Sequence, residues 1–271
     1  MVARAHRFLP LRPAALAAAL LLPALALGQG KGKVEITWYG HAAFSVKTPG
    51  GTVILIDPWL SSPKAPEKGL ADSIPKVDYI LVSHGHFDHV GDAVAVAKRT
   101  GAKLITNFEL ATALVAAGYP KDSAGFDTVG NMGGAIQAGD ATVIMVPAVH
   151  SSGIADAEGH NQVGGNPMGF VIKVKNGPTL YHTGDTDVTQ DMRLIPERYG
   201  AVDVMMACIG GHFTMDPKGA ALAAEMVKAK TVIPMHFGTF PVLNGTPDEL
   251  KAALKGKAKV EVLEPGKPMM F

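Results

Sequence analysis

The chain has 271 residues, of which 47% are hydrophobic and 18% are charged. This composition excludes an intrinsically disordered chain and allows a substantial core in one large domain or two small ones. The single cysteine excludes internal disulfides, and its apolar surroundings at 204–209 indicate that Cys208 is a small, buried hydrophobic side chain. The alternative is a role as a metal ligand.

The first 28 residues have the pattern of an export signal. Arg4, Arg7 and Arg12 precede an apolar stretch at 14–27 that is short for a membrane span, and small residues at its end offer cleavage sites. We therefore predict a cleaved signal peptide at 1–28 and a periplasmic or secreted mature protein. The alternative is an uncleaved N-terminal anchor.

Removing this segment leaves 22 Lys and Arg against 24 Asp and Glu, which gives the mature chain a net charge of −2. This charge argues against nucleic acid as a partner and against stable association with an anionic membrane. The expected partner is a small-molecule substrate, and no oligomeric state is indicated. No linker or repeat interrupts residues 29–271, so they are predicted to form a single domain.

The domain begins with predicted strands. Alternating polar and apolar residues predict strands at 34–39, 43–48 and 52–57, the last two joined by a turn at Pro49-Gly50-Gly51. The segment 58–76 is rich in Pro, Ser and Lys and predicts a long loop at the rim of a site.

An apolar run at 79–82 predicts a buried strand, which leads directly into four candidate metal ligands. His84, His86, Asp88 and His89 form the pattern His-x-His-x-Asp-His in a chain with ten histidines. His84 and His86 lie two apart in extended chain, so they project to one side and can share an ion. Asp88 and His89 follow the turn and can face a second ion. The cluster predicts a metal site at the end of the strand.

Helices and strands alternate beyond this cluster. The predicted elements are a helix at 92–99, a strand at 103–106, a helix at 107–117 with Asn107 as its N-cap, and strands at 135–137 and 142–147. The segment 151–167 is rich in Gly and Asn and predicts a second rim loop.

The C-terminal part opens with a hairpin signal at Asn176-Gly177. The predicted elements are strands at 169–174 and 179–183, a helix ending near 199, a strand at 204–209, a helix from 216, a strand at 231–235, a helix from the capping box at 246–249 and a strand at 260–262. Strands and βα units in this order predict an α/β (α+β) protein with two sheets packed face to face and helices outside each.

Three further candidate ligands each follow an apolar strand: His150, Asp185 and His236. Strand ends that converge on one edge of a sandwich bring distant residues together. With the first cluster, these residues complete a ligand set for two ions. The predicted set is His84, His86 and His150 for one ion, Asp88, His89 and His236 for the other, and Asp185 as a bridge.

Ligation rich in imidazole favours two Zn²⁺ ions, and Mn²⁺ or Fe would also fit. Two ions about 3.5–4 Å apart bind a shared water and lower its pKa. The expected nucleophile is therefore a dinuclear-metal-bound hydroxide, with Asp88 or Asp185 carrying the proton to the leaving group. Seven ligands for two ions leave positions for water, which favours catalysis.

The pattern His-x-His-x-Asp-His with later His, Asp and His resembles the metallo-β-lactamase superfamily. Five further motifs are similar, more narrowly, to the branch of metal-dependent hydrolases related to ascorbate-6-phosphate lactonase. They are Trp38-Tyr39-Gly40-His41, Ile56-Asp57-Pro58-Trp59, His182-Thr183-Gly184-Asp185-Thr186, Gly211-His212-Phe213-Thr214-Met215 and Pro234-Met235-His236-Phe237.

The resemblance covers nearly all of 34–271 and implies a four-layer αββα sandwich of two mixed β-sheets with helices on both outer faces. It implies that Asp57 fixes the orientation of a ligand. It also draws attention to His41 and His212, which follow predicted strands and could bind substrate or stabilise an oxyanion. The export signal departs from the branch and argues against phosphorylated intracellular substrates.

The expected function is a metal-dependent hydrolase that attacks an ester, a lactone or a phosphodiester. One alternative is a lactonase of the acyl-homoserine-lactone type; a β-lactamase is disfavoured because Asp185 stands where those enzymes carry cysteine. A different class is a non-catalytic metal-binding protein of the cell envelope. Metal content together with turnover of generic esters, lactones and phosphodiesters distinguishes these classes.

Overall fold

The computed structural model describes residues 1–2, 32–156 and 158–271. Nearly all of the predicted signal peptide at 1–28 therefore lies outside the described residues. Within the described parts of the chain, no helix has the length and apolar character needed to cross a membrane.

The first sheet has six strands in the order β15-β1-β2-β3-β4-β5. Its strands are β1 (Glu35–Trp38), β2 (Phe44–Lys47), β3 (Val53–Ile56), β4 (Tyr79–Leu81), β5 (Lys103–Ile105) and β15 (Pro268–Met270). Neighbours from β15 to β3 pair antiparallel, whereas β3, β4 and β5 are parallel. The sheet is therefore mixed, and its parallel strands end at the same edge.

The second sheet has seven strands in the order β14-β13-β12-β11-β10-β7-β6. Its strands are β6 (Ala135–Ala138), β7 (Ala141–Pro147), β10 (Met168–Val174), β11 (Thr179–His182), β12 (Val204–Cys208), β13 (Thr231–Met235) and β14 (Lys259–Val260). The pairs from β11 to β14 are parallel, and those from β6 to β11 are antiparallel. Asn176, with a φ of 56°, turns the chain between β10 and β11 at the predicted hairpin.

Successive side chains along a strand point to opposite faces of the sheet, so each inner strand contributes to two hydrophobic clusters. In β3, Ile54 and Ile56 pack into the core shared with the second sheet, whereas Leu55 packs into the core beneath the outer helices. In β4, Leu81 faces inward and Ile80 outward by the same period of two. Because both faces of these strands are buried, they consist of continuous apolar residues.

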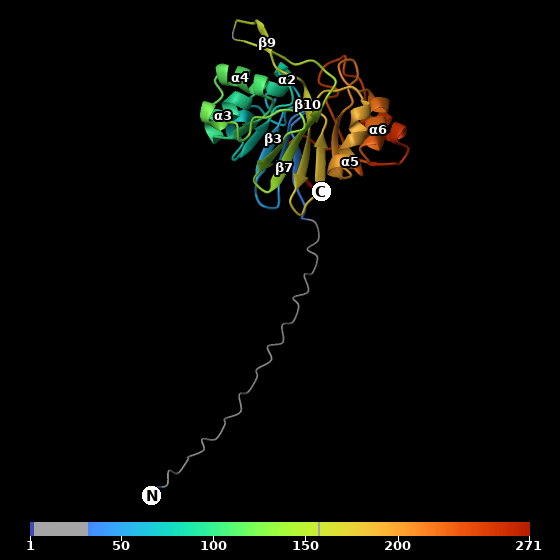
Figure 1. Cartoon of the computed structure of the whole chain (residues 1–271). Helices are drawn as coiled ribbons and strands as arrows, with labels where there is room; N and C mark the ends of the chain where they lie inside the picture. Colours follow the sequence, from blue (N-terminus) through green and yellow to red (C-terminus); the bar gives the residue numbers. More distant parts are fainter. Residues whose placement is uncertain (3–31, 157) are drawn as a thin grey trace.

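Helices cover both outer faces (Figure 1). The first sheet is covered by α1 (Leu70–Ser73), α3 (Ala93–Thr100) and α4 (Phe108–Ala116), and the second by α5 (Leu194–Tyr199), α6 (Pro217–Met226) and α7 (Pro247–Leu254). The prediction of a four-layer αββα sandwich with two mixed sheets is confirmed.

Local structure differs from the predictions at three places. The segment 58–76 contains the single turn α1, and the segment 151–167 contains a two-stranded ribbon, β8 (Gly153–Ala155) and β9 (Asn161–Val163). The ribbon was missed because β9 is exposed along its whole length and so carries no apolar alternation. Strand β15 was missed because it is a three-residue edge strand that begins with proline.

Three of the predicted helix starts, at Asn107, Asp216 and Thr246, have the side-chain caps that the sequence indicated. Asn107 Oδ1 accepts from Leu110 N at 2.8 Å, and Asp216 Oδ1 accepts from Gly219 N at 2.7 Å. Thr246 and Glu249 form a complete capping box at the start of α7. These bonds satisfy backbone donors that a helix leaves without partners.

We expect Thr246→Ala to lower the free energy of unfolding by about 1 kcal/mol, because it removes the acceptor for Glu249 N. Chemical denaturation of both proteins measures this difference. Thr112→Ala is the matched control: Thr112 is an exposed helical threonine whose hydroxyl bonds only to Phe108 O. A loss at position 112 as large as that at 246 would contradict the role of the cap.

Cys208 is fully buried in β12, as predicted, and burial raises the pKa of its thiol to about 11. Its Sγ lies 3.6 Å from Thr186 O and 3.6 Å from Thr183 Oγ1. The thiol packs in the core behind the strand ends and belongs to none of the candidate metal-binding groups among the described residues.

Candidate metal centre

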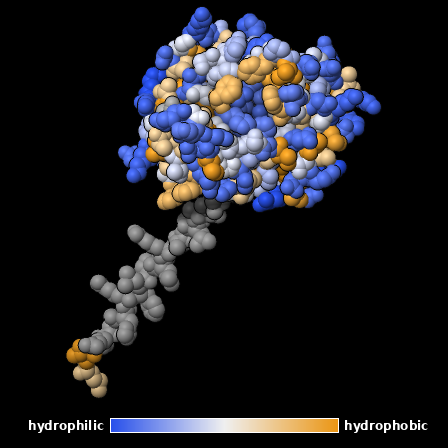
Figure 2. Space-filling model, turned by 90° about the horizontal axis from the view of Figure 1, so that it is seen from above, coloured by the Kyte–Doolittle hydropathy of each residue, from blue (hydrophilic) through white to orange (hydrophobic). Residues whose placement is uncertain are grey.

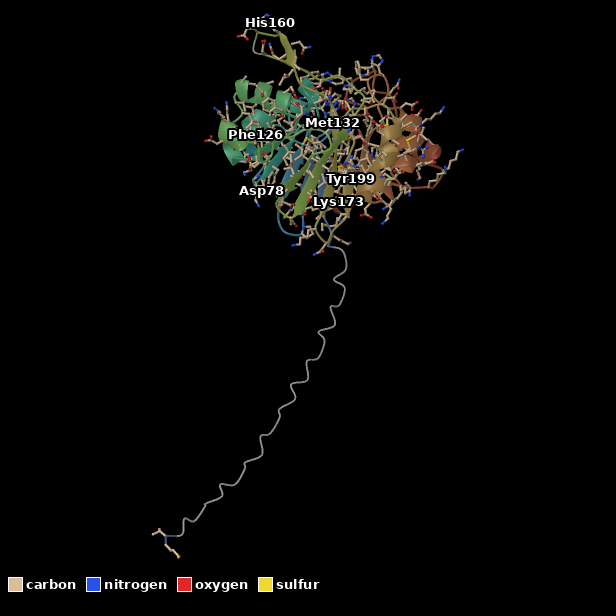
Figure 3. The ribbon with its side chains drawn as sticks, in the orientation of Figure 1. Asp78, Phe126, Met132, His160, Lys173 and Tyr199 are labelled. Atoms are coloured by element: carbon tan, nitrogen blue, oxygen red, sulfur yellow. The ribbon has the colours of Figure 1, made fainter. Side chains whose placement is uncertain are left out.

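The candidate ligands lie where strands of both sheets end. His84 and His86 follow β4, His150 follows β7, Asp185 follows β11 and His236 follows β13. These four strands end at one edge of the sandwich, so residues separated by some 150 positions meet there. Ribbon β8–β9 extends from the same end, with His160 near its tip (Figure 3).

A single helical turn, α2 (Phe87–Val90), carries two of the ligands. His86 stands in extended conformation just before it, and Asp88 and His89 lie within it. Gly85 approaches the ribbon so closely that a Cβ there would come within 2.8 Å of Gly153 O. The turn therefore sits between the sheet edge and the ribbon.

Three imidazoles form the first cluster. His84 Nε2 lies 2.9 Å from His86 Nδ1, and His150 Nε2 lies 3.3 Å from the same nitrogen. Ser83 Oγ, at 3.0 Å, is the partner of His84 Nδ1, which leaves His84 Nε2 free to face the other two rings. His84 is buried, whereas His86 and His150 are partly exposed.

The second cluster consists of Asp88, His89 and His236, with His41 behind Asp88. His236 Nε2 lies 3.7 Å from Asp88 Oδ2. Asp185 stands between the clusters: its Oδ1 is 3.3 Å from His89 Nε2, and its Oδ2 is 2.9 Å from His236 Nε2 and 3.7 Å from His150 Nε2. One carboxylate thus reaches members of both groups.

Three of the converging atoms, in the second cluster and on Asp185, make no hydrogen bond. His89 Nε2, His236 Nε2 and Asp185 Oδ1 are buried and lack a partner in hydrogen-bond geometry, although they lie within 3.3 Å of nitrogen or oxygen neighbours. Buried polar atoms rarely remain unsatisfied. Imidazole nitrogens and carboxylate oxygens that converge without bonding to one another fit divalent cations held between them.

The electrostatics of the site also favour bound positive charge. Burial opposes ionisation of Asp185, but His236 and His89 outweigh it and hold the pKa of Asp185 well below its usual range. For His236, burial is outweighed by Asp185, which raises the pKa to about 9. In the first cluster, burial lowers the pKa of His84, His86 and His150, so those rings are neutral and free to bind a cation.

Asp57 lies beneath the second cluster and is fully buried. Its Oδ2 is 2.8 Å from His89 Nδ1 and accepts from Ser83 Oγ at 2.7 Å, while its Oδ1 accepts from Ser83 N at 2.7 Å. This contact directs His89 Nε2 towards Asp185. Ser83 was missed from the sequence, although its place directly before the His-x-His pattern could have indicated it.

His41 is fully buried, so a substrate does not reach its ring directly. Its Nε2 lies 3.0 Å from Asp88 Oδ2, and its Nδ1 lies 2.9 Å from Thr239 Oγ1. Burial lowers the pKa of His41 to about 4, so the neutral ring donates from Nε2 to Asp88 and accepts from Thr239. The structure thus places His41 as a support for Asp88, and Thr239 as a residue that the sequence did not indicate.

The remaining histidines lie outside the two clusters. His212 is exposed, with a φ of 58°, and its ring packs against Phe213 at 4.4 Å. His182 bonds to Ala42 O and accepts from Gly184 N, next to Asp185. His160 belongs to an exposed group with Asp156 and Glu158, in which Asp156 bonds the backbone of the ribbon turn.

Gly91 ends α2 in a conformation, φ 40° and ψ −119°, that side chains other than hydrogen rarely allow. A Cβ there would lie 2.5 Å from Trp59 Cα and 2.7 Å from Pro58 O. We expect Gly91→Ala to lower the free energy of unfolding by about 2–4 kcal/mol, because backbone must move to admit the methyl group.

Gly101→Ala is the control for the Gly91 prediction. Gly101 also has a positive φ, of 71°, but nothing lies within 4 Å of its Cβ position. Its replacement is expected to cost about 1–2 kcal/mol from backbone strain alone. Denaturant titrations compare the two variants, and equal losses would show that the contact with Pro58 and Trp59 is unimportant.

Comparisons with known proteins show the family to which the chain belongs. Residues 52–237 match the family model described as the beta-lactamase superfamily domain. A UPF0173 metal-dependent hydrolase of Anaeromyxobacter sp. (strain K) is 76% identical over 241 residues, which cover 89% of this chain and 88% of that protein. One from Thermodesulfovibrio yellowstonii is 50% identical over 252 residues, covering 90% of this chain and 92% of that protein.

Among solved structures, the chain is similar to Igni18, described as a novel metallo hydrolase from the hyperthermophilic archaeon Ignicoccus hospitalis. The TM-score is 0.76 at 35% sequence identity, and the match covers 88% of this chain and 98% of that one.

Proposed function

The chain belongs to the metallo-β-lactamase superfamily as a metal-dependent hydrolase, and from that premise we propose that it hydrolyses an ester, lactone or phosphodiester bond. Two divalent cations, with Zn²⁺ favoured by the donor set, are proposed as its cofactors. The observation that carries this proposal is the convergence of His89 Nε2, His236 Nε2 and Asp185 Oδ1, which are buried and make no hydrogen bond.

The proposed ligands form two groups that share Asp185. Asp185 reaches members of both clusters, which is the arrangement expected of a bridging carboxylate. The first cation is assigned to His84, His86 and His150, and the second to Asp88, His89 and His236.

Two divalent cations held by these residues would supply a water of lowered pKa and would neutralise the charge that develops on the substrate. Asp88 is proposed to move the proton. Its side chain is 13% exposed, against 3% for Asp185. Burial opposes ionisation, but the His236 and His41 side chains outweigh it and lower the pKa of Asp88, so the group is a carboxylate before the reaction.

In the reaction, the oxygen of water forms a bond to carbon or phosphorus, and the bond to the leaving group breaks. Asp88 receives the proton of the attacking water and gives it to the leaving oxygen. His41 Nε2, at 3.0 Å from Asp88 Oδ2, fixes the carboxylate during this transfer. Partial exposure of His86 and His150 leaves one side of the centre open to substrate.

Metal content and turnover test the proposal together. The purified protein is expected to contain close to two divalent cations per chain by plasma mass spectrometry and to hydrolyse at least one of p-nitrophenyl acetate, an acyl-homoserine lactone and bis-p-nitrophenyl phosphate. A chelator should abolish turnover, and Zn²⁺ or Mn²⁺ should restore it. Turnover that is unchanged after complete removal of metal would sink the proposal.

We also propose that the protein is exported and acts on a small-molecule substrate outside the cytoplasm. The basic residues and apolar stretch at 1–28 support export. Mass spectrometry of the protein recovered from its native cells tests this. A mature chain beginning near residue 29 in the periplasmic or secreted fraction is the expected result, and a full-length cytoplasmic chain would contradict it.

A further inference from the structure

We propose that three aromatic side chains, Trp59, Phe87 and Phe240, form a wall beside the metal centre that selects substrates carrying an aryl group next to the bond that is cleaved. This aromatic wall rests on the proposed function and narrows its substrate class. Its members come from three separate segments: the loop after β3, the turn α2 and the loop after β13.

The three rings form one continuous group. Trp59 and Phe240 stack at 6.0 Å with an interplanar angle of 22°. Phe87 packs edge-on against Trp59 at 5.5 Å and against Phe240 at 6.5 Å. These separations are those of favourable aromatic pairs, and they hold each ring in a defined orientation.

The aromatic wall is adjacent to the second cluster, both along the chain and through the His41 ring. Phe87 stands in the chain between His86 and Asp88, one from each cluster. The rings of Trp59 and Phe240 contact the His41 ring at 5.3 and 6.0 Å, and His41 Nε2 lies 3.0 Å from Asp88 Oδ2. Through His41, the rings of Trp59 and Phe240 are therefore one side chain away from Asp88, the residue proposed to move the proton.

The rings are also available to a ligand. Phe87 is 68% exposed, although burying a phenylalanine stabilises a fold by about 1.5–3 kcal/mol. Trp59 and Phe240 are each partly exposed. Among the described residues, the cation–π contact found is that of Arg198 with Tyr199, and it involves none of the three rings of the aromatic wall. Figure 2 shows apolar side chains at the surface of this end of the sandwich.

An aryl group has the chemistry that this surface recognises. A flat ring can lie against Phe87 or enter edge-on beside Trp59, adding favourable ring contacts to the burial of apolar area. A phosphorylated sugar would need cationic or hydrogen-bonding groups there instead. The aromatic wall thus favours an aryl ester, an aryl-substituted lactone or an aryl phosphodiester over their small aliphatic counterparts.

Equilibrium binding tests this without requiring turnover. The metal-loaded protein is titrated with acetohydroxamate and with benzohydroxamate, which offer cations the same chelating group without and with a phenyl ring. Benzohydroxamate is expected to bind about 10- to 30-fold more tightly. Because Trp59 is one of two tryptophans and Trp38 is only 5% exposed, benzohydroxamate should also change the tryptophan fluorescence.

Three variants locate the effect. Phe87→Ala should reduce the preference to about threefold or less while leaving acetohydroxamate affinity and metal content unchanged. Trp59→Phe should retain most of the preference and lose the fluorescence response. Phe126→Ala is the matched control: Phe126 is 88% exposed, stacks on Phe108 and lies on the flank of the sandwich (Figure 3), so its loss should change neither quantity.

The binding measurements distinguish failure of the aromatic-wall proposal from failure of the proposed hydrolase function. If the protein holds cations and binds both hydroxamates equally, the proposed selection of aryl substrates is wrong, whereas the proposed hydrolase function stands. If it holds no cation, both are overturned. If ultracentrifugation shows a dimer that Phe87→Ala dissociates, the rings form an interface with a second copy of the chain, and the proposal is likewise overturned.

Discussion

Replacement of Asp185 by asparagine is expected to lower kcat/KM about 10³-fold or more and to remove at least one of two bound cations, while the chain remains folded. Bound cations stabilise the transition state of such reactions by several kcal/mol, and each 1.36 kcal/mol of activation free energy changes the rate tenfold. The substitution acts on both clusters, because Asp185 lies close to His89 and His236 of the second cluster and to His150 of the first.

The physical reason is the loss of charge rather than of shape. The Asp185 carboxylate is ionised despite burial, since His236 and His89 hold its pKa well below its usual range. An asparagine of the same size presents one oxygen and one N–H₂ group to the facing imidazoles. The N–H₂ group cannot bind a cation, so one cluster loses its shared ligand.

Asp187→Asn is the matched control for this experiment. Asp187 lies two residues along the chain, is exposed, and its Oδ1 accepts only from Val188 N at 2.8 Å. Metal content by plasma mass spectrometry and kcat/KM on the best substrate of the panel are measured for both variants. Wild-type metal content and turnover in Asp185→Asn would remove Asp185 from the centre.

The fold could be predicted well because its signals are local. The apolar strands are continuous where both faces are buried, as in β4 and β13, and the caps at Asn107 and Thr246 mark helix starts. Ribbon β8–β9 and strand β15 carry no such signal. Their stability comes from backbone pairing with a partner, Val163 with Gly153 or Met270 with Glu35, and pairing leaves little trace in composition.

The convergence of the candidate ligands could be predicted from strand order, since each residue follows a strand that ends at the same edge. The supporting contacts could not. Neither Thr239 nor Ser83 is a metal ligand by type, and their contacts with His41 and His84 depend on which side of a turn each side chain faces. His41 illustrates the same limit: its place after β1 suggested substrate contact, whereas its positive φ of 51° turns the ring into the protein.

Asp57→Asn is expected to lower the affinity for the second cation about 10- to 100-fold, the usual effect of losing a partner that orients a ligand. Asp57 touches no proposed cation and acts only through His89. The carboxylate accepts from Ser83 N with Oδ1 and faces both Ser83 Oγ and His89 Nδ1 with Oδ2. In asparagine, Oδ1 must keep the bond from Ser83 N, so the N–H₂ group takes the place of Oδ2.

That N–H₂ group faces His89 Nδ1 at 2.8 Å, so Nδ1 must become an acceptor and the ring proton moves to Nε2. A protonated Nε2 cannot bind the second cation. Competition with a chelating dye measures both affinities, and the first cation should remain bound with near wild-type affinity. Asp78→Asn is the control, since Asp78 also accepts a backbone bond, from Val53 N at 2.8 Å, but lies at the other end of the sandwich from the ribbon (Figure 3). Equal losses of metal in the two variants would show a general weakening of the fold, whereas a loss in Asp57→Asn alone identifies the tautomer of His89 as the cause.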